Sequence, residues 1–393
     1  MPSPDVLDFA KLLAPISADK PTGTDPRLDP SPNSPYFKIK DDRRKACEFE
    51  RPGADHPPDW AIVRQLAVKI LTEQAKDLNV VTYLIEALVR LDGFAGLRDG
   101  FRLARELVEK HWETLYPLPD PVEVTREQEL KAKPTPTREE MEELQALNEE
   151  FRSTRLAPLI GLNGHESDGT LLAPIARVPI TDMTSIGQFA LAQYNEGNFL
   201  KKITDPKLQQ QKIDNGAVTL DKFQKAVAES EPAFYLKLVD DLNAAITELG
   251  KLAAALDQRC DGKGPPTSSI RTRMTECLDI VKETAKEKLR VAVPKPDEAK
   301  KDGAPAAGQP GAAPSAVQSR EQALDSLLKV ADFFRRTEPH SPISYALDQV
   351  VRWGRMPLPE LWTELIADDA PRKSVFKQVG IRPGDDKKEA PKK

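Results

Sequence analysis

The stretch LNVVTYLIEALVRLDG, residues 78–93, decides the fold because it is apolar on nearly every side. A helix that is apolar all round must be surrounded by other elements, so we expect a buried central helix that ends near Gly93. Residues 94–117 follow with apolar side chains at helical spacing until a proline stops the pattern. Upstream, Asp59 is placed to cap a helix whose apolar face begins at Trp60. The sequence therefore predicts a helical N-terminal domain.

The rest of the chain is predicted to be mainly α as well. A strongly charged helix is expected over about residues 138–151, and helices are expected within 219–230, 231–260 and 267–289. The exception is RLAPLIGLNGHESDGTLLAPIARVPIT, residues 155–181, where two apolar runs flank a turn rich in Gly, Asn and Asp. This pattern predicts one short β-hairpin.

Composition narrows the function classes. The 393 residues carry a net charge of −5, which provides no general field for nucleic acid. The three cysteines are scattered without a CxxC pair, which favours a reducing compartment over disulfides or a structural zinc site. The N-terminus lacks the pattern of a secretion signal, and no run approaches the roughly 20 apolar residues that cross a bilayer. We expect a cytoplasmic protein that neither binds nucleic acid nor inserts into a membrane.

Proline, with 35 residues, marks the predicted boundaries. Between the helical segments, the stretch PKPDEAKKDGAPAAGQPGAAP has no large apolar residue that could anchor it, which predicts a disordered linker. The predicted parts are an N-terminal domain at 1–183, a helical middle domain at 184–290, a linker at 291–317, a small helical C-terminal domain at 318–382 and a tail at 383–393.

A search for catalytic or metal-binding motifs finds none. His165-Glu166 resembles the start of a zinc motif, but no second histidine follows at i+4, so a polar turn is the favoured interpretation. Cys47 follows two arginines without a nearby histidine, which favours a packing role over a nucleophile. A small basic cluster is read as a solvated surface rather than a nucleic-acid groove: Lys201, Lys202 and Lys207. No catalytic residue, metal or cofactor is predicted.

The stretch FFRRTEPHSPISYALDQVVRWGRMPLPEL, residues 333–361, is dense in functional side chains. Glu338, His340 and Ser341 are neighbours on backbone that prolines hold extended, so their side chains should point in different directions, which disfavours a catalytic triad. A unit of about 65 residues can hardly bury this many large apolar groups, so an oligomer interface is favoured over an internal core, and catalysis is the weakest alternative. The predicted interface residues are Arg335, Arg336, Glu338, Arg352, Trp353, Leu361 and Trp362.

These residues also carry a resemblance. The run RRTEPHSP at 335–342, followed by Arg352-Trp353-Gly354, resembles the C-terminal signature of the ImpA/TssA family of type VI secretion proteins, in its short form. The front half is similar to the N-terminal domain of the same family, beginning with Gly23-Thr24-Asp25 and Arg27. Further matching positions, read as mainly structural, are Trp60, Lys76, Asp77, Leu78, Gly93, Phe94, Gly96 and Trp112. The charged segment at 122–137 is longer than the family pattern leads us to expect.

The resemblance implies a structural assembly factor of the type VI secretion system and not an enzyme. Its implied partners are other copies of itself in a ring, baseplate proteins, the Hcp tube and sheath proteins, and the inner-membrane complex, at which it would dock in the cytoplasm. Its implied task is to coordinate the growth of tube and sheath. A transient helical scaffold or a tail-assembly chaperone is the open alternative.

Overall fold

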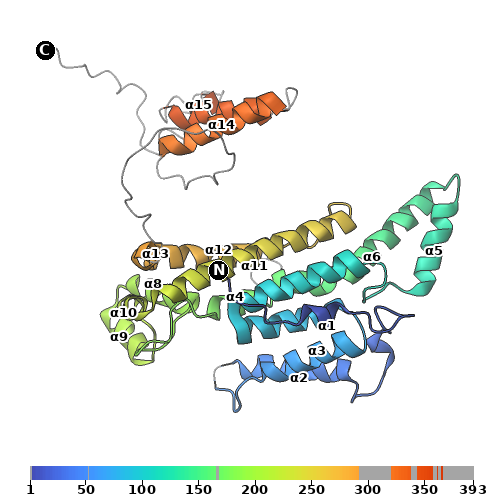
Figure 1. Ribbon diagram of the computed structural model, residues 1–393, viewed down its shortest axis with the longest axis horizontal. Coiled ribbons are helices and arrows are strands. Elements are labelled where there is room, and N and C mark those ends of the chain that lie inside the picture. The colour runs from blue at the N-terminus through green and yellow to red at the C-terminus, as the bar shows by residue number, and fades with distance from the viewer. Residues whose placement is uncertain are drawn as a thin grey trace, which may run out of the picture. The chain divides into compact units, whose positions relative to one another are not determined.

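The structure is a computed structural model that describes residues 2–51, 53–164, 168–291, 320–337, 343–356, 361 and 364–365. It divides into two compact units, residues 1–297 and 298–393, and most of the described chain is helical (Figure 1). The predicted tail and residues 292–317 of the predicted linker lie outside the described residues, whereas Val291 still belongs to a helix.

The first unit is built around α4 (Leu78–His111). Asp77 caps this helix, and Gly93, at φ 58° and ψ −134°, divides it into two helical halves. A positive φ favours glycine because it has no Cβ. Helix α3 (Trp60–Glu73) and helix α11 (Pro232–Arg259) both pack along α4. Most of the apolar stretch at residues 78–93 is thus buried at the centre of the unit.

Shorter helices surround this centre (Figure 1). In the first half of the unit they are α1 (Phe9–Leu13), η1 (Pro26–Leu28), α2 (Pro35–Phe49), α5 (Pro121–Ala132), α6 (Arg138–Asn163) and α7 (Leu172–Arg177). In the second half they are α8 (Leu191–Lys201), α9 (Pro206–Asp214), α10 (Leu220–Glu229), α12 (Ser268–Thr284) and α13 (Lys286–Val291).

One continuous core crosses the boundary that we predicted at residues 183–184. Leu84 and Leu97 of α4 belong to the same buried cluster as Leu242 and Leu249 of α11. Side chains from both halves of the sequence therefore exclude water together. The predicted division into an N-terminal and a middle domain stays a prediction about units of function.

The predicted β-hairpin is wrong. Its first apolar run belongs to α6, which continues to Asn163, and its second run forms α7. Leu156, Leu159 and Leu162 are buried at a spacing of three, which is a helical and not a strand period. The turn between the runs therefore joins two helices, and across the described residues only isolated β-bridges occur.

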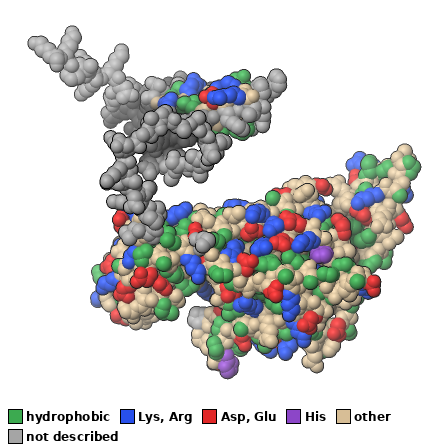
Figure 2. All heavy atoms as spheres, in the orientation of Figure 1, with side chains coloured by type: hydrophobic (Ala, Val, Ile, Leu, Met, Phe, Trp, Pro, Cys, Tyr) green, Lys and Arg blue, Asp and Glu red, His purple; other side chains and the backbone are tan. Residues whose placement is uncertain are grey.

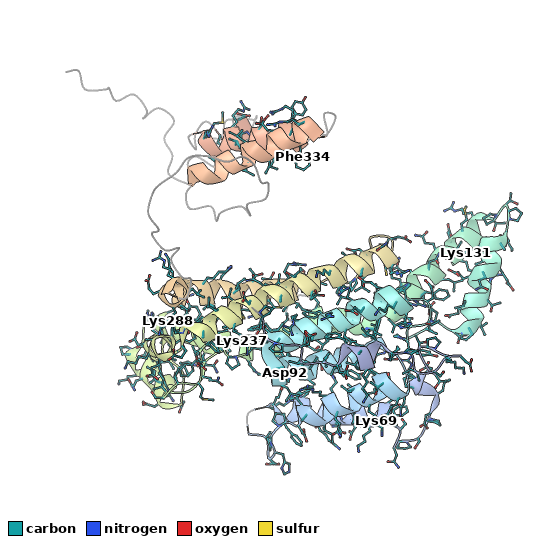
Figure 3. All side chains as sticks on the ribbon, viewed as in Figure 1. Lys69, Asp92, Lys131, Lys237, Lys288 and Phe334 are labelled. Atoms are coloured by element: carbon teal, nitrogen blue, oxygen red, sulfur yellow. The ribbon has the colours of Figure 1, made fainter. Side chains whose placement is uncertain are left out.

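Helix α5 and the outer part of α6 form an arm that projects from the first unit (Figure 1). We call residues 120–155 the arm; Lys131 lies on it (Figure 3). The prolines at 134 and 136 end one helix and Thr137 begins the next with a capping box. The long charged segment noted in the sequence thus builds most of one side of this arm.

The second unit contains α14 (Arg320–Thr337) and α15 (Ile343–Arg355), which pack against each other. Leu324 and Ala331 of α14 and Val351 of α15 are buried. Part of the apolar surface of α14 therefore points inward.

Candidate functional site: a buried junction and the C-terminal helices

Three signature segments that are distant in sequence meet at one buried junction. The amide of Lys76 donates to the carbonyl of Thr22 at 2.9 Å, and the amide of Tyr116 donates to the carbonyl of Lys76 at 3.1 Å. The amide of Leu78 then donates to the carbonyl of Tyr116 at 2.8 Å. The junction therefore ties the segment before η1, the start of α4 and the segment after α4 together.

Gly23 allows this close approach. Its φ is +78°, and a Cβ at this position would lie 1.9 Å from the carbonyl oxygen of Gln74. Any other residue would have to displace backbone, so the signature glycine is fixed by space as well as by conformation.

Asp77 does two structural tasks inside the junction. Its Oδ1 accepts from the amide of Val80 at 3.1 Å and caps α4, while its Oδ2 accepts from Nη1 of Arg27 at 2.9 Å. The side chain is fully buried, and burial raises the pKa of Asp77, although Arg27 and the capping amides oppose the shift. Both oxygens are occupied, so Asp77 is not placed to act as a general base.

Arg27 lies between two aromatic rings. Its guanidinium is 5.6 Å from the ring centre of Tyr36 and 5.9 Å from that of Tyr116, and its Nε pairs with Asp25 at 2.9 Å. The hollow beside it measures about 530 Å³ and is lined in part by Asp25, Tyr36 and exposed Leu28. The arrangement holds η1 against α2 and leaves a shallow surface feature.

Lys76 is fully buried and has no carboxylate partner within the described chain. Its ammonium donates to the carbonyls of Leu12 and Leu71, each at 2.6 Å. Burial lowers the pKa of Lys76 to about 8. Because Leu12 lies near the end of α1 and Leu71 near the end of α3, the cation satisfies carbonyls at two helix C-termini.

Trp60 is buried at the start of α3, 3% exposed. Its Nε1 donates to Oε1 of Glu50 at 2.7 Å, and the guanidinium of Arg90 lies over its ring and pairs with the same carboxylate. The group links α2, α3 and α4. Within this group the charges of Glu50 and Arg90 compensate each other.

The remaining N-terminal signature positions line α4. Phe94 is buried after the kink at Gly93, and Gly96 packs against the backbone of Leu88. Trp112 caps the end of α4, half-buried, with the guanidinium of Arg155 4.8 Å from its ring centre.

In the C-terminal unit, the predicted arginines find partners within the chain. Arg335 pairs with Asp332 and, from α14 to α15, with Asp348. Arg352 pairs with Glu364, whose carboxylate also accepts from Nε1 of Trp353 at 3.1 Å. Arg336 is exposed and Leu361 is half-buried, while Glu338 and Trp362 lie outside the described residues.

Sequence reasoning missed the most exposed apolar groups of this unit. Tyr345 is 70% exposed, and Val330, Val350 and Leu365 are also exposed. Among the described side chains of α15, Ser344 and Val351 are buried. The many apolar residues of this helix are the signal in the sequence, because a single packed face cannot cover all of them.

No group of three or more His, Cys, Asp or Glu side chains that could hold a metal ion is assembled among the described residues. Burial raises the pKa of the Cys47 thiol, and it raises that of Cys277 to about 12, so neither is an activated nucleophile. His165 and Glu166 lie outside the described residues. None of the helices described is both long and apolar enough to span a membrane.

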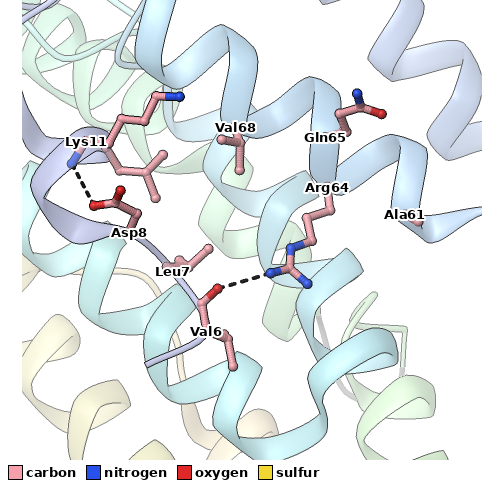
Figure 4. A pocket seen from close by; sticks show the side chains of 9 residues that line it. Val6, Leu7, Asp8, Lys11, Ala61, Arg64, Gln65 and Val68 are labelled. Atoms are coloured by element: carbon pink, nitrogen blue, oxygen red, sulfur yellow. Dashed lines mark hydrogen bonds between the residues drawn. The ribbon is translucent and has the colours of Figure 1, made fainter. Parts of the chain in front are cut away.

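A small cavity of about 390 Å³ lies between the N-terminal segment and α3 (Figure 4). Nη2 of Arg64 donates to the carbonyl of Val6 at 3.1 Å, and the amide of Lys11 donates to Asp8 at 3.1 Å. Because these polar groups are engaged by the chain itself, the cavity is a packing gap and not a chemical site.

Comparison with known proteins identifies a family domain in the first unit. Residues 13–164 match the family described as ImpA, N-terminal, type VI secretion system. The chain thus carries an N-terminal domain of the ImpA/TssA type. It is 37% identical over 120 residues to the type VI secretion system component TssA1 of Pseudomonas aeruginosa. That match covers 29% of this chain and 33% of the relative, so the chain matches about a third of the relative's length.

A solved structure extends the likeness in fold. It is the N-terminal domain, including the conserved ImpA_N region, of the TssA component from Burkholderia cenocepacia. The TM-score is 0.56 at 22% identity, and the alignment covers 74% of this chain and 98% of that one. In this ImpA-type domain the buried junction gives Gly23, Arg27, Lys76 and Asp77 a structural task, because their contacts hold one helical scaffold in shape.

Proposed function

We propose that this chain is a non-enzymatic assembly component of the bacterial type VI secretion system. The observation that carries this proposal is the ImpA N-terminal domain at residues 13–164, joined in the same chain to a separate compact helical unit. The family match supports the role of a type VI secretion component.

The charged groups of the N-terminal domain support binding rather than catalysis. Asp77 is held by Arg27, and Glu86 receives two hydrogen bonds from Arg43 at 2.5 and 2.7 Å. A catalytic acid or base needs an accessible atom that a substrate can reach. Here the buried carboxylates are occupied by the chain's own arginines, which gives a rigid scaffold.

The C-terminal helices supply the proposed contact between copies. Tyr345 and Val350 of α15 and Val330 of α14 present apolar area to solvent in the described part of this unit. Exposed aromatic and apolar groups on a small helical unit favour association. We infer that this face, together with the predicted residues around Trp353, joins copies into a ring.

The partners follow from the family resemblance. They are baseplate proteins, the Hcp tube and sheath proteins, and the inner-membrane complex at which the protein docks from the cytoplasm. In this proposal the ring sits at the base of the growing tube, while the N-terminal domains reach further partners. Neither nucleic acid nor membrane insertion is part of the proposal.

Sedimentation of the full chain tests the proposal. A ring gives one large species that persists on dilution, and a secretion-deficient strain that lacks this protein regains sheath assembly when the chain is supplied. The alternative, a transient scaffold or tail-assembly chaperone, predicts a small species that leaves the assembled sheath. Normal sheath dynamics without the protein would reject both.

A further inference from the structure

The arm carries an apolar stripe that the chain does not cover. Between residues 138 and 155 no side chain of α6 is buried. Met141, Leu144 and Phe151 nevertheless recur at helical spacing along this stretch, and Met141 is 53% exposed. In Figure 2, hydrophobic side chains reach the surface of the arm. A stripe of this kind normally packs against another helix.

The stripe forms one wall of a groove of about 1120 Å³. The opposite wall carries half-buried Trp112, Leu118 and Val124, and the inner end is closed by the turn that follows α11. The groove is thus a long depression between two helices with apolar groups on both sides. This is the geometry in which an amphipathic helix lies in a groove.

Ion pairs, rather than a large core, hold the two helices of the arm together. Arg126 of α5 donates to both oxygens of Glu143 of α6, at 2.7 and 2.8 Å. Lys133 pairs with Glu140 near the tip, and Leu130 is the one buried side chain of α5. The apolar side chains that line the groove are therefore not the groups that hold α5 and α6 together.

The net charge of the arm indicates which kind of partner helix the groove can bind. Residues 120–155 contain ten carboxylates and six basic side chains, so the arm is strongly acidic. Desolvation, together with the nearby carboxylates of Glu150 and Asp120, raises the pKa of Glu123. Two acidic arms would repel each other, which disfavours a second copy of this chain as the occupant.

Most basic side chains along the groove are already engaged. Lys131 pairs with Glu127 and Arg152 pairs with Glu149. Two more donate to backbone carbonyls: Arg155 to that of Trp112 at 2.6 Å, and Arg259 to that of Glu109 at 2.9 Å. Lys263, at the inner end, is the remaining one. The groove lining itself is nearly balanced, because the same lining holds the carboxylates of Glu113, Glu127, Glu149 and Asp261. The excess negative charge of the arm therefore lies beside the groove, where Asp120, Glu123 and Glu150 are close to one another.

We propose that this groove binds an amphipathic helix of another protein, with an apolar stripe flanked by lysine or arginine. The stripe would cover Met141, Leu144 and Phe151, and the flanking cations would meet the carboxylates of the arm. Such a third helix completes the packing that two helices alone cannot provide. The inference does not depend on ring formation by the C-terminal unit.

Synthetic peptides test the groove directly with the full-length chain. One helical peptide of about 18 residues, five turns, carries leucines on one face and lysines beside them. A second peptide replaces the lysines by glutamates, and a third replaces the leucines by serines. Fluorescence anisotropy should give at least about tenfold tighter binding for the lysine peptide than for the glutamate peptide, and no binding for the serine peptide.

Matched variants locate the binding. Met141→Ser, in the groove, should weaken binding of the lysine peptide at least about fivefold. Val122→Ser should leave this affinity unchanged, because Val122 is 77% exposed on α5 and lies outside the groove lining. Glu123→Gln combined with Glu150→Gln should reduce the preference for lysine. Circular dichroism checks that each variant keeps its helices.

Several outcomes would overturn the proposal. These are binding of neither leucine peptide, equal binding of the lysine and glutamate peptides, or an unchanged affinity in Met141→Ser. Concentration-dependent dimerisation of the full chain that Met141→Ser abolishes would assign the groove to a second copy instead.

Discussion

The guanidinium of Arg90 lies 3.8 Å from the centre of the Trp60 ring, and both side chains hold the same carboxylate, that of Glu50. A cation over an aromatic ring and a half-buried ion pair thus occur at the same place. Because Glu50 caps the end of α2, Trp60 begins α3 and Arg90 belongs to α4, this contact fixes three helices to one another.

Removing the ring should therefore destabilise the first unit strongly. For Trp60→Ala we expect a loss of about 3–5 kcal/mol in the free energy of unfolding, from the cavity and the lost ring contact. Trp60→Phe keeps a ring but leaves Glu50 without the indole donor, and should lose about 1–2 kcal/mol. Chemical denaturation followed by circular dichroism measures both. An unchanged midpoint for Trp60→Ala would show that the ring serves an exposed contact.

Lys76 should make stability depend on pH. In the folded protein its pKa is lowered to about 8, against 10.5 for the ordinary side chain. Between these values the unfolded chain binds more protons, so the folded state gains stability as pH rises from about 8 toward 10.5. Lys76→Met should lose this rise and, near neutral pH, should also lose the two hydrogen bonds to carbonyls.

The measurement is urea denaturation of both proteins from pH 7 to 10. The difference in the free energy of unfolding between the wild type and Lys76→Met cancels the titration of the other groups. This difference should increase with pH. If this difference did not change with pH, the two carbonyls would be keeping the ammonium of Lys76 charged in the folded protein.

The arm should open when its cross-helix ion pair is removed. Arg126→Met breaks the contact with Glu143 between α5 and α6, whereas Arg138→Met removes only a contact within α6, to Glu142. Limited proteolysis at the turn between the helices should accelerate for the first variant and not for the second.

Lowering the pH should also open the arm. Hydrogen bonds from Arg126 lower the pKa of Glu143, and those from Lys133 lower the pKa of Glu140. The stabilisation is present above the ordinary glutamate pKa and is lost as pH falls through the lowered values. Equal cleavage of the wild type and Arg126→Met at neutral pH would contradict this role.

The C-terminal face should control oligomer size. Tyr345→Glu places a charge in the proposed interface, and Trp353→Ala removes a predicted anchor; each should convert a large species into small ones. Met183→Glu, 72% exposed in the first unit, is the matched control and should leave the size unchanged. His340→Ala, at a position outside the described residues, should also have no effect.

Sedimentation velocity gives the size, and circular dichroism shows whether each variant keeps its helices. A large species in Tyr345→Glu would move the interface to another face. Loss of helicity in Trp353→Ala would place that side chain in the core of its unit.

Much of the fold was readable from periodicity. Residues 78–93 were predicted as a buried helix ending near Gly93, and α4 bends there. The hairpin at 155–181 could not be excluded because short apolar runs beside a glycine-rich turn fit both a strand and the end of a helix. The structure shows a helix there, with Leu156, Leu159 and Leu162 buried on one face.

Local pattern and residue identity were enough to indicate the family resemblance, the mainly helical class and the positions of the signature residues. It could not show that Gly23, Lys76 and Tyr116 share one junction, or that α11 completes the core around α4. It also could not show that the charged segment at 122–137 builds an arm with an open apolar groove. These features depend on contacts between segments far apart in the chain, and only tertiary packing decides which apolar faces are covered and which remain exposed.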